Sequence, residues 1–388
     1  MTEKDLYFDW AATSPADEDI LKDALNAAQE CWGNPSSAHS TGKKARALLE
    51  EARKRAAAAL GVDSGHVYFT SGGTESNQIP LLSVMTKPAA GTVLVSAVEH
   101  PAVREQAMAM RHCGWKVAVI PSDKNGIITP DAVISSLTKD TMIVCVMAVN
   151  NETGAIQPVH EIADALTEAC AGGRRPKLHV DCVQAAGKIR LDIARKGIDS
   201  AAFSAHKICG PRGIGILYSK DSPEPFLRGG GQEKGVRSGT ENVFGAVAFS
   251  KCLERYHNKD EMMENQRART ERFLSLLATL KGCTVVPESR LENPGLYSPF
   301  IVQAGFDKIP GNVMVRAMDA RGICISTGSA CSTRKNVRPV LEAMGVSAQV
   351  RESAVRFSFG PGTTQEAMDA LFDAVRGVCA EFNGGRRG

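Results

Sequence analysis

Three short motifs place reactive side chains directly after apolar runs. The first, VYFTSGGTESN at 67–77, has two glycines where an apolar run ends and a helix is expected to begin at Thr74. Glycines let the backbone approach an anion closely, and free N–H groups at a helix start bind phosphate. Taken alone, the motif fits an ordinary strand-to-helix turn better than a phosphate site.

The other two motifs add an acid and an amine. LHVDCVQ at 178–184 contains Asp181, and FSAHK at 203–207 ends in Lys207, each after an apolar run. Singly, such residues are more often helix caps, ion-pair partners or exposed loop charges. Because ligands of open α/β sheets gather outside the carboxyl ends of the strands, we expect the three motifs to meet. A phosphate cradle, a carboxylate and an amine are what pyridoxal phosphate (PLP) needs for its phosphate, ring nitrogen and aldehyde.

The first 240 residues alternate β-forming apolar runs with amphipathic segments. The runs lack strict alternation, which is typical of strands buried on both faces of a sheet. A helix is expected at 42–60, capped by Ser40 or Thr41 and stopped by Gly61. Two further helices are expected at 101–112 and 160–171. The expected strands are 67–70, 92–96, 142–149, 177–181, 199–203 and 214–218. This order predicts an α/β domain with a mostly parallel sheet.

The pattern changes near residue 240. Residues 241–281 look almost entirely helical, and isolated strands and helices follow, which is typical of a smaller α+β domain. We expect a large domain at 15–255 and a small domain formed by 1–14 and 256–388. The expected small-domain elements are strands at 299–303, 323–326 and 354–359 and helices at 311–321 and 365–381.

Composition and charge exclude several classes of protein. A net charge of +3 in 388 residues does not favour a direct nucleic-acid partner. No apolar run approaches the ~20 residues of a membrane span, and the N-terminal MTEKDLYFDW lacks a signal-peptide region, so we expect a cytoplasmic protein. In such a reducing compartment we expect no disulfide framework among the 11 cysteines.

The chain resembles the cysteine desulfurases of the class V aminotransferase group, in the branch related to nitrogen-fixation and iron–sulfur-cluster enzymes. This likeness, rather than composition or spacing, identifies the activity. It implies a PLP-dependent fold of type I and a homodimer. The motifs that carry it are FDWAATSP, GNPSSAHSTG, FTSGGTESN, EHPAV, VNNETG, HVDCVQAAGK, SAHKICGPRGIG, GGGQEKGVRSGT, STGSACS and VRFSFG, which span nearly the whole chain.

The resemblance also implies roles for single residues toward PLP. Lys207 would bind the cofactor as a Schiff base, and Asp181 would pair with the pyridinium nitrogen. Gln184 would contact the ring hydroxyl, while His100 would stack on the ring and assist proton transfer. The phosphate would be held by Gly73, Thr74, Ser204 and His206, with Thr240 added from the neighbouring subunit.

Three more residues would act on the substrate, L-cysteine. Asn151 and Arg356 would bind its carboxylate, although a structural salt bridge is an equally good reading of Arg356 from the residues alone. Cys331, in a run of small polar residues, would take the sulfur as a persulfide, leave L-alanine, and pass the sulfur to an acceptor for iron–sulfur clusters or another thio-cofactor. We expect no intrinsic metal, with Cys331 contacting iron or a cluster only during transfer.

The chain also departs from the family pattern. Arg334, Lys335 and Arg338 make the segment after Cys331 basic, either as solvated loop charges or to favour a thiolate or an acidic acceptor. Ala205 and Val183 replace the usual glycine and threonine, and little chain follows 365–381 to dock a scaffold partner. The alternatives left open are a selenocysteine lyase, a class V aminotransferase, or a binding protein of this fold without turnover.

Overall fold

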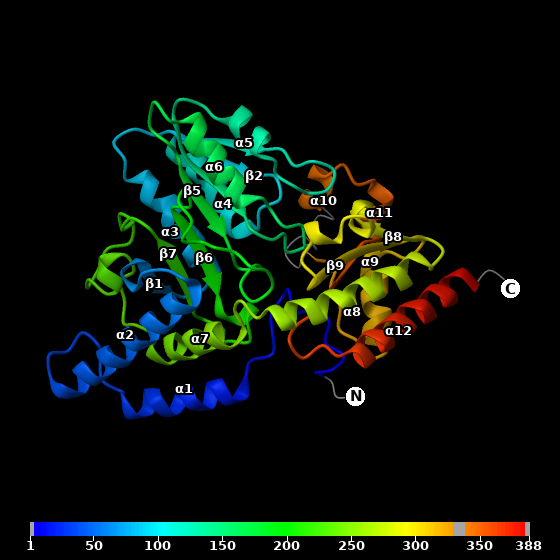
Figure 1. The fold of residues 1–388 in the computed structure, drawn as a ribbon, viewed down its shortest axis with the longest axis horizontal. Coiled ribbons are helices and arrows are strands. Elements are labelled where there is room, and N and C mark those ends of the chain that lie inside the picture. The colour runs from blue at the N-terminus through cyan, green and yellow to red at the C-terminus, as the bar shows by residue number, and fades with distance from the viewer. Residues whose placement is uncertain (1–3, 329–337, 385–388) are drawn as a thin grey trace.

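A computed structural model describes residues 4–328 and 338–384 of the chain. Within these residues a seven-stranded sheet has the order β1-β7-β6-β5-β4-β2-β3, with helices packed around it (Figure 1). The strands are β1 (Val67–Thr70), β2 (Thr92–Ser96), β3 (Lys116–Ile120), β4 (Thr141–Met147), β5 (Lys177–Asp181), β6 (Ser200–Ser204) and β7 (Gly215–Ser219). The helices are α1 (Glu18–Glu30), α2 (Ser40–Leu60), α3 (Gly73–Met85), α4 (Pro101–Met110), α5 (Pro130–Ser136), α6 (Val159–Ala169) and α7 (Val243–Tyr256).

The large sheet is mostly parallel, as predicted. Strands β3, β2, β4, β5 and β6 run parallel to one another, and β7 alone is antiparallel to both of its neighbours, β6 and β1. The residues of β4, β5, β6 and β7 are almost all buried, because helices cover both faces. The carboxyl ends of β5 and β6 therefore lie at the same edge of the sheet, and this edge carries Asp181 and Ser204.

A second, three-stranded antiparallel sheet has its own apolar core. Its order is β10-β9-β8, and Phe273, Phe306 and Phe357 pack edge to face in its core. Phe8 belongs to this core, since the N-terminal segment pairs with Cys324 and Ser358 in isolated bridges. The elements are β8 (Cys283–Val286), β9 (Ile301–Phe306), β10 (Val355–Ser358), α8 (Asp260–Ala278), α9 (Gly311–Asp319), α10 (Pro339–Ala343), α11 (Ala348–Ser353) and α12 (Gln365–Gly384).

Some elements differ from the sequence predictions. Edge strand β3 was not predicted, although VAVI at 117–120 is a continuous apolar run; four of its five residues are exposed or partly exposed. Strand β8, with the sequence CTVV, was not predicted either. Residues 323–326 form isolated bridges rather than a strand, and the helical stretch 241–281 is interrupted between α7 and α8 at 257–259. The predicted domain boundary near 255 lies beside this interruption and stays a prediction.

The start of α2 is also different. His39 caps the helix, because its Nδ1 accepts a hydrogen bond from the Gly42 N–H at 3.2 Å, so the prediction of Ser40 or Thr41 was wrong. Gly61 ends the helix with a φ of 71°, as expected of a left-handed C-terminal cap.

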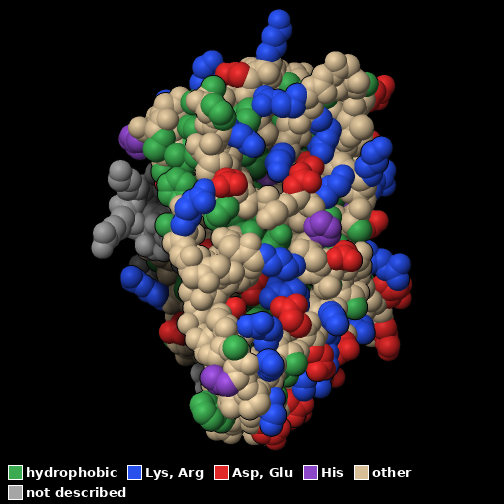
Figure 2. Space-filling view, turned by 90° about the vertical axis from the view of Figure 1, so that its left-hand side faces the viewer, with side chains coloured by type: hydrophobic (Ala, Val, Ile, Leu, Met, Phe, Trp, Pro, Cys, Tyr) green, Lys and Arg blue, Asp and Glu red, His purple; other side chains and the backbone are tan. Residues whose placement is uncertain are grey.

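The surface shows no dominant charge on the face drawn in Figure 2. Basic and acidic side chains lie among one another there, and hydrophobic side chains gather over part of it. Among the described residues, no helix has both the length and the apolar character that crossing a membrane requires.

Candidate active site

A cavity of about 940 Å³ lies between the two sheets and is lined by residues of both. Ten residues predicted from the sequence meet there, although they come from segments far apart in the chain. They are Gly73, Thr74, His100, Asn151, Asp181, Gln184, Ser204, His206, Lys207 and Arg356.

Two predicted residues are not among those that line the cavity. Thr240 is exposed to solvent elsewhere, and its predicted contact with a neighbouring subunit stays a prediction. Cys331 lies outside the described residues, as do Arg334 and Lys335. The described chain resumes on either side of that segment with Gly328 and Arg338, and Gly328 and Pro339 both line the cavity.

The N-terminus of α3 opens on the cavity without a side-chain cap. The helix begins at Gly73, one residue earlier than predicted, and no side chain of the described residues caps its start. A Cβ on Gly73 would lie 2.8 Å from Val183 Cγ2 and 3.3 Å from Ser204 Cβ, so only glycine allows these segments to approach so closely. Uncapped N–H groups beside the Ser204 hydroxyl form an arrangement that suits a phosphate.

Asp181 presents a buried carboxylate at the end of β5. The backbone N–H of Val183 donates to its Oδ1 at 2.9 Å, and Asn77 Nδ2 donates to its Oδ2 at 2.9 Å. Burial raises the pKa of Asp181 to about 6, against the opposing effect of these hydrogen bonds and of the Lys207 charge. The carboxyl group therefore ionises near neutral pH, as a partner for a cationic ring nitrogen must.

Lys207 reaches the cavity from a 3-10 turn that follows β6. Its Nζ donates to the carbonyl oxygens of Ala11 and Ala12, each at 2.6 Å. Burial, and then the positive charge of Arg356, lower the pKa of Lys207 to about 8. A substantial fraction of this amine is neutral near pH 8, which an attack on an aldehyde requires.

His100 combines a structural and a chemical position. Its Nδ1 accepts a hydrogen bond from the Ala102 N–H at 3.1 Å and so caps α4, while the ring remains open to the cavity. Enclosure by the cavity walls, followed by the charge of Lys207, lowers the pKa of His100 to about 4. The ring is therefore neutral at pH 7, and its proton lies on Nε2.

Gln184 and His206 line the cavity but already have protein partners. Gln184 donates from Nε2 to the Ala11 carbonyl at 2.9 Å and accepts from Lys188 Nζ at 2.5 Å. His206 Nδ1 lies 3.2 Å from Thr13 Oγ1. Their predicted contacts with PLP would therefore either add to these hydrogen bonds or replace them.

The sequence allowed two interpretations of Arg356, a structural salt bridge and a binding site for the substrate carboxylate, and the structure supports both. Its Nη2 donates to Asp9 Oδ1 at 2.7 Å in a partly buried ion pair, and its Nη1 donates to the carbonyl oxygens of Asn151 and Gly328. Among the described residues, its buried Nε has no hydrogen-bond partner. The guanidinium also lines the cavity, where a carboxylate could approach it.

Arg338 corrects the prediction of a solvated or acceptor-guiding loop charge. Its side chain is largely buried, and its Nη2 lies 3.4 Å from the buried carboxylate of Glu152. Its Nη1 also donates to the carbonyl oxygens of Arg351 and Ala354. The pKa of Glu152 is raised and that of Arg338 is lowered, because burial disfavours each charged form more than the attraction between the two charges favours it. Arg338 is a structural ion-pair partner, and its charge is not free for an acceptor.

Replacing Arg338 with methionine is expected to lower the free energy of unfolding by about 3 kcal/mol at pH 8, because it leaves the Glu152 carboxylate buried without its cation. The loss should be smaller at pH 5. A folded-state pKa above the unfolded value means that the folded state binds the extra proton, so stability falls as pH rises. Urea denaturation at both pH values measures this.

Two further variants control that measurement. Arg351→Met removes a more exposed ion pair with Glu342 and should cost less than about 1 kcal/mol. Combining Arg338→Met with Glu152→Gln should recover much of the stability and remove the pH dependence. A single variant whose loss is the same at both pH values would contradict the assignment of Glu152 as the stranded charge.

Sequence reasoning missed several neighbours of the site. Asp9, Ala11 and Ala12 line the cavity, although FDWAATSP was noted only as a family motif. Asn77 and Glu152 were present in TESN and NNETG, but neither motif showed that they contact Asp181 and Arg338. These contacts join residues more than 100 positions apart, and no local pattern signals them.

The residues of the cavity fit PLP. The uncapped start of α3 suits its phosphate, the buried Asp181 its ring nitrogen, and Lys207 its aldehyde. Among residues 4–328 and 338–384, no group of three or more His, Cys, Asp or Glu side chains is placed to hold a metal ion.

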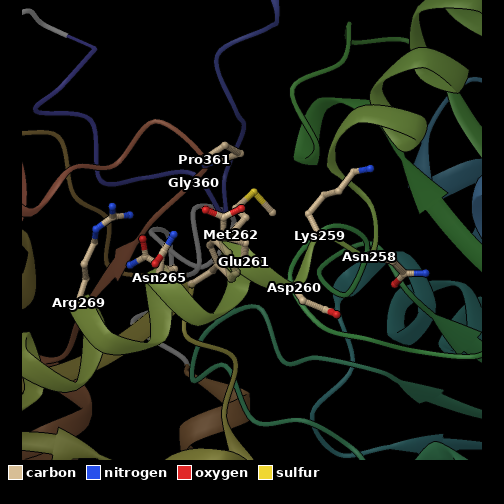
Figure 3. A pocket seen from close by; sticks show the side chains of 11 residues that line it. Asn258, Lys259, Asp260, Glu261, Met262, Asn265, Arg269, Gly360 and Pro361 are labelled. Carbon is tan, nitrogen blue, oxygen red and sulfur yellow. The ribbon is translucent and has the colours of Figure 1, made fainter.

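A second hollow, of about 470 Å³, lies where α7 gives way to α8 and is bounded by Gly360 and Pro361 (Figure 3). Its two basic side chains, Arg269 and Lys259, lie on opposite sides of the view. Arg269 also donates to the Thr363 carbonyl at 3.1 Å. The hollow shares no lining residue with the cavity described above and does not gather reactive groups around one point.

Comparison with known proteins gives consistent results. Residues 6–371 match the family model described as aminotransferase class-V. The chain is 37% identical to a "NifS/IcsS protein homolog" of Lactobacillus delbrueckii subsp. bulgaricus, over 97% of this chain and 98% of that protein. It is also 37% identical to "Cysteine desulfurase IscS 1" of Archaeoglobus fulgidus, over 96% of each.

Solved structures agree with the sequence relatives. A structure described as "NIFS-LIKE PROTEIN" superposes with a TM-score of 0.88 at 32% identity, covering 97% of this chain and 99% of that one. The NifS-like protein from Rickettsia africae gives a TM-score of 0.83 at 27% identity, covering 98% and 99%. The chain therefore belongs to the class V aminotransferase family, and it is similar over nearly its full length to NifS-like proteins and cysteine desulfurases.

Proposed function

We propose that the protein is a cysteine desulfurase that uses PLP to convert L-cysteine and the thiol of Cys331 into L-alanine and a persulfide on Cys331. The observation that carries this proposal is the single cavity that brings Lys207 and Asp181 together with both ends of the segment that contains Cys331. Bound PLP would draw electron density from the substrate α-carbon and so make its proton acidic.

Lys207 is assigned two tasks in this reaction. Its amine would hold the cofactor, and after L-cysteine displaces it, the neutral amine would take the α-proton. The pKa of about 8 suits both tasks, because a larger share of the amine is unprotonated near neutral pH than in an ordinary lysine. Asp181 would keep a negative charge against the cofactor ring, and His100 would offer its Nε2 proton from the cavity wall.

Arg356 and Asn151 are assigned to the substrate carboxylate. Arg356 is already fixed in orientation by Asp9 and by the Asn151 and Gly328 carbonyls, so little entropy is lost when it binds an anion. A guanidinium can bind both carboxylate oxygens at once, whereas an ammonium group cannot.

Arg356→Lys is expected to raise the KM for L-cysteine about 10- to 100-fold, because one or two charge-assisted hydrogen bonds to the carboxylate are lost. The affinity for PLP should change little, and kcat should fall less than kcat/KM. Steady-state kinetics and a PLP titration measure these quantities. Arg316→Lys, on α9 and outside the cavity, is the matched control. An unchanged KM would remove Arg356 from substrate binding.

The second half of the reaction is assigned to Cys331. Its thiolate would attack the substrate sulfur, the C–S bond would break, and the carbon would be protonated to give L-alanine. The persulfide would then pass to an acceptor for iron–sulfur clusters or another thio-cofactor, and Cys331 would contact iron only at that stage. With Arg338 paired to Glu152, the basic charges left for an acidic acceptor are Arg334 and Lys335.

We further propose a cytoplasmic homodimer, in which Thr240 of one subunit serves the phosphate of the other. Exposed apolar side chains support a contact surface, since Trp32 is 76% exposed and Leu227 is 72% exposed. Several cysteines that the structure describes, such as Cys113, Cys145 and Cys182, are free thiols, which suits a reducing compartment. Sedimentation at several concentrations tests the dimer.

One assay separates this function from its rivals. Purified protein with PLP and dithiothreitol should release equal amounts of L-alanine and sulfide from L-cysteine. A selenocysteine lyase would turn over selenocysteine and leave cysteine unchanged, and an aminotransferase would need an added keto acid. If the protein binds PLP but turns over none of these substrates, the remaining alternative is a binding protein of this fold without enzymatic activity.

A further inference from the structure

Three buried polar side chains, Ser200, His179 and Asn77, form a chain that ends at Asp181, and Asn77 also lines the cavity. Ser200 Oγ lies 2.8 Å from His179 Nδ1, and His179 Nε2 lies 2.8 Å from Asn77 Oδ1. Asn77 Nδ2 then donates to Asp181 Oδ2 at 2.9 Å. His179 is 0% exposed, Asn77 1% and Asp181 4%, so these groups have little or no water to bond with.

The chain has one consistent direction of donation. An ionised Asp181 only accepts hydrogen bonds, so Asn77 must turn its NH₂ group to the carboxylate and its oxygen to His179. His179 Nε2 must then carry the ring proton. Burial lowers the pKa of His179 to about 3, so the ring is neutral and its Nδ1 accepts from the Ser200 hydroxyl. Each donor in the chain therefore points toward Asp181.

We propose that Asn77 and His179 are positioning residues for the cofactor ring, which hold the Asp181 carboxylate ionised and in a fixed orientation toward the ring nitrogen. The inference rests on the proposed PLP function and deepens it. Asn77 acts on Asp181 directly, and His179 acts through Asn77 by fixing which way its amide points. A chain of aligned donors also polarises its last member, so the hydrogen bond to the carboxylate is strengthened.

Asn77 also couples the two ends of the proposed cofactor site. It lies on α3 four residues after Gly73, one helical turn from the uncapped N-terminus that is proposed to hold the phosphate. Its hydrogen bond joins this helix to the end of β5. The distance between the phosphate site and the acid that faces the ring is therefore set by one helix turn and one hydrogen bond.

A purely structural role makes a different prediction. If the chain only satisfied buried polar groups, its loss would lower stability and leave the ionisation of Asp181 unchanged. The proposed role requires a change at the ring nitrogen of bound PLP, because a misplaced or protonated Asp181 no longer supports the ring cation. The experiment therefore reads the cofactor and the histidine directly, with activity as a secondary measurement.

The test compares three variants with one control. His179→Phe and Asn77→Leu break the chain at similar volume, and His179→Gln restores an N–H donor toward Asn77. Ser76→Ala removes a neighbouring buried hydroxyl on α3, which bonds to Thr70 and not to Asp181, and controls for general damage to the helix. Thermal unfolding of each protein confirms that it is folded.

PLP titrations of the full-length proteins give the first result. We expect the Kd for PLP to rise about 10- to 100-fold in His179→Phe and Asn77→Leu, since a hydrogen bond to a charged group is lost. His179→Gln should recover most of the affinity, and Ser76→Ala should stay within about threefold of the native protein. With ¹⁵N-labelled PLP, the ring nitrogen should be protonated in the native protein and less so in the two breaking variants.

A ¹⁵N NMR spectrum of the cofactor-free native protein gives a second, independent result. At pH 7, His179 should show a protonated Nε2 and an unprotonated Nδ1. An imidazolium or the opposite tautomer would overturn the proposal, and so would breaking variants whose PLP affinity and ring protonation match those of Ser76→Ala. If the native protein bound no PLP at all, the proposed function would fail while the NMR result still tested the chain of donors.

Discussion

Lys207→Ala is expected to lower the release of L-alanine from L-cysteine by about 10³-fold or more, because one side chain is assigned both cofactor attachment and α-proton transfer. No other amine among the residues lining the cavity can replace it, since Lys207 is the only lysine in that described set. Product assays and mass spectrometry of the borohydride-reduced protein measure activity and covalently held PLP. Both should be lost together.

The control for this prediction is Lys196→Ala, which removes an exposed lysine and should leave activity unchanged. Added methylamine should partly restore proton transfer in Lys207→Ala, since it supplies a small neutral amine to the cavity. A variant at position 207 that kept native turnover would refute the assignment of the lysine and with it the proposed mechanism.

Cys331→Ser is expected to keep PLP binding and to lose alanine and sulfide release by about 10³-fold or more, because an unperturbed hydroxyl is a far weaker nucleophile than a thiolate. After exposure to L-cysteine, mass spectrometry of the native protein should show one added sulfur on the peptide that contains Cys331. The variant should show none.

Cys113→Ser is the matched control, because Cys113 is the exposed free thiol of a 3-10 turn distant in sequence from the site. It should retain activity and carry no added sulfur. Full activity in Cys331→Ser would remove this thiol from the mechanism and favour a reading, such as aminotransfer, that does not use it. The two predictions are separable, since the lysine variant loses PLP attachment and the cysteine variant does not.

Much of the large sheet could be predicted because its strands are short and buried on both faces. The runs at 67–70, 92–96 and 177–181 coincide with β1, β2 and β5, since continuous apolar β-forming residues leave little choice of structure. The edge strand β3 was missed even though four of its five residues are apolar, so its composition does not explain the miss. The missed His39 cap shows a different limit, since a ring nitrogen can substitute for the hydroxyl that the pattern favours.

Candidate residues could be named from motifs, but their partners could not. Asp181 and Lys207 follow strands of the expected type, so their approach to one another was foreseeable from the sheet. The partners of Arg338 and Asp181, Glu152 and Asn77, lie 186 and 104 residues away in the chain. Only the folded chain brings such pairs together.

The sequence by itself determined the family, the α/β architecture and the residue types that can perform PLP chemistry on an amino acid. The tertiary structure decided their ionisation. Burial lowers the pKa of Lys207 to about 8 and raises that of Asp181 to about 6, and neither shift follows from the neighbouring residues in the chain. It also decided that Arg338 pairs with Glu152, because desolvation and charge pairing depend on what surrounds a group in space.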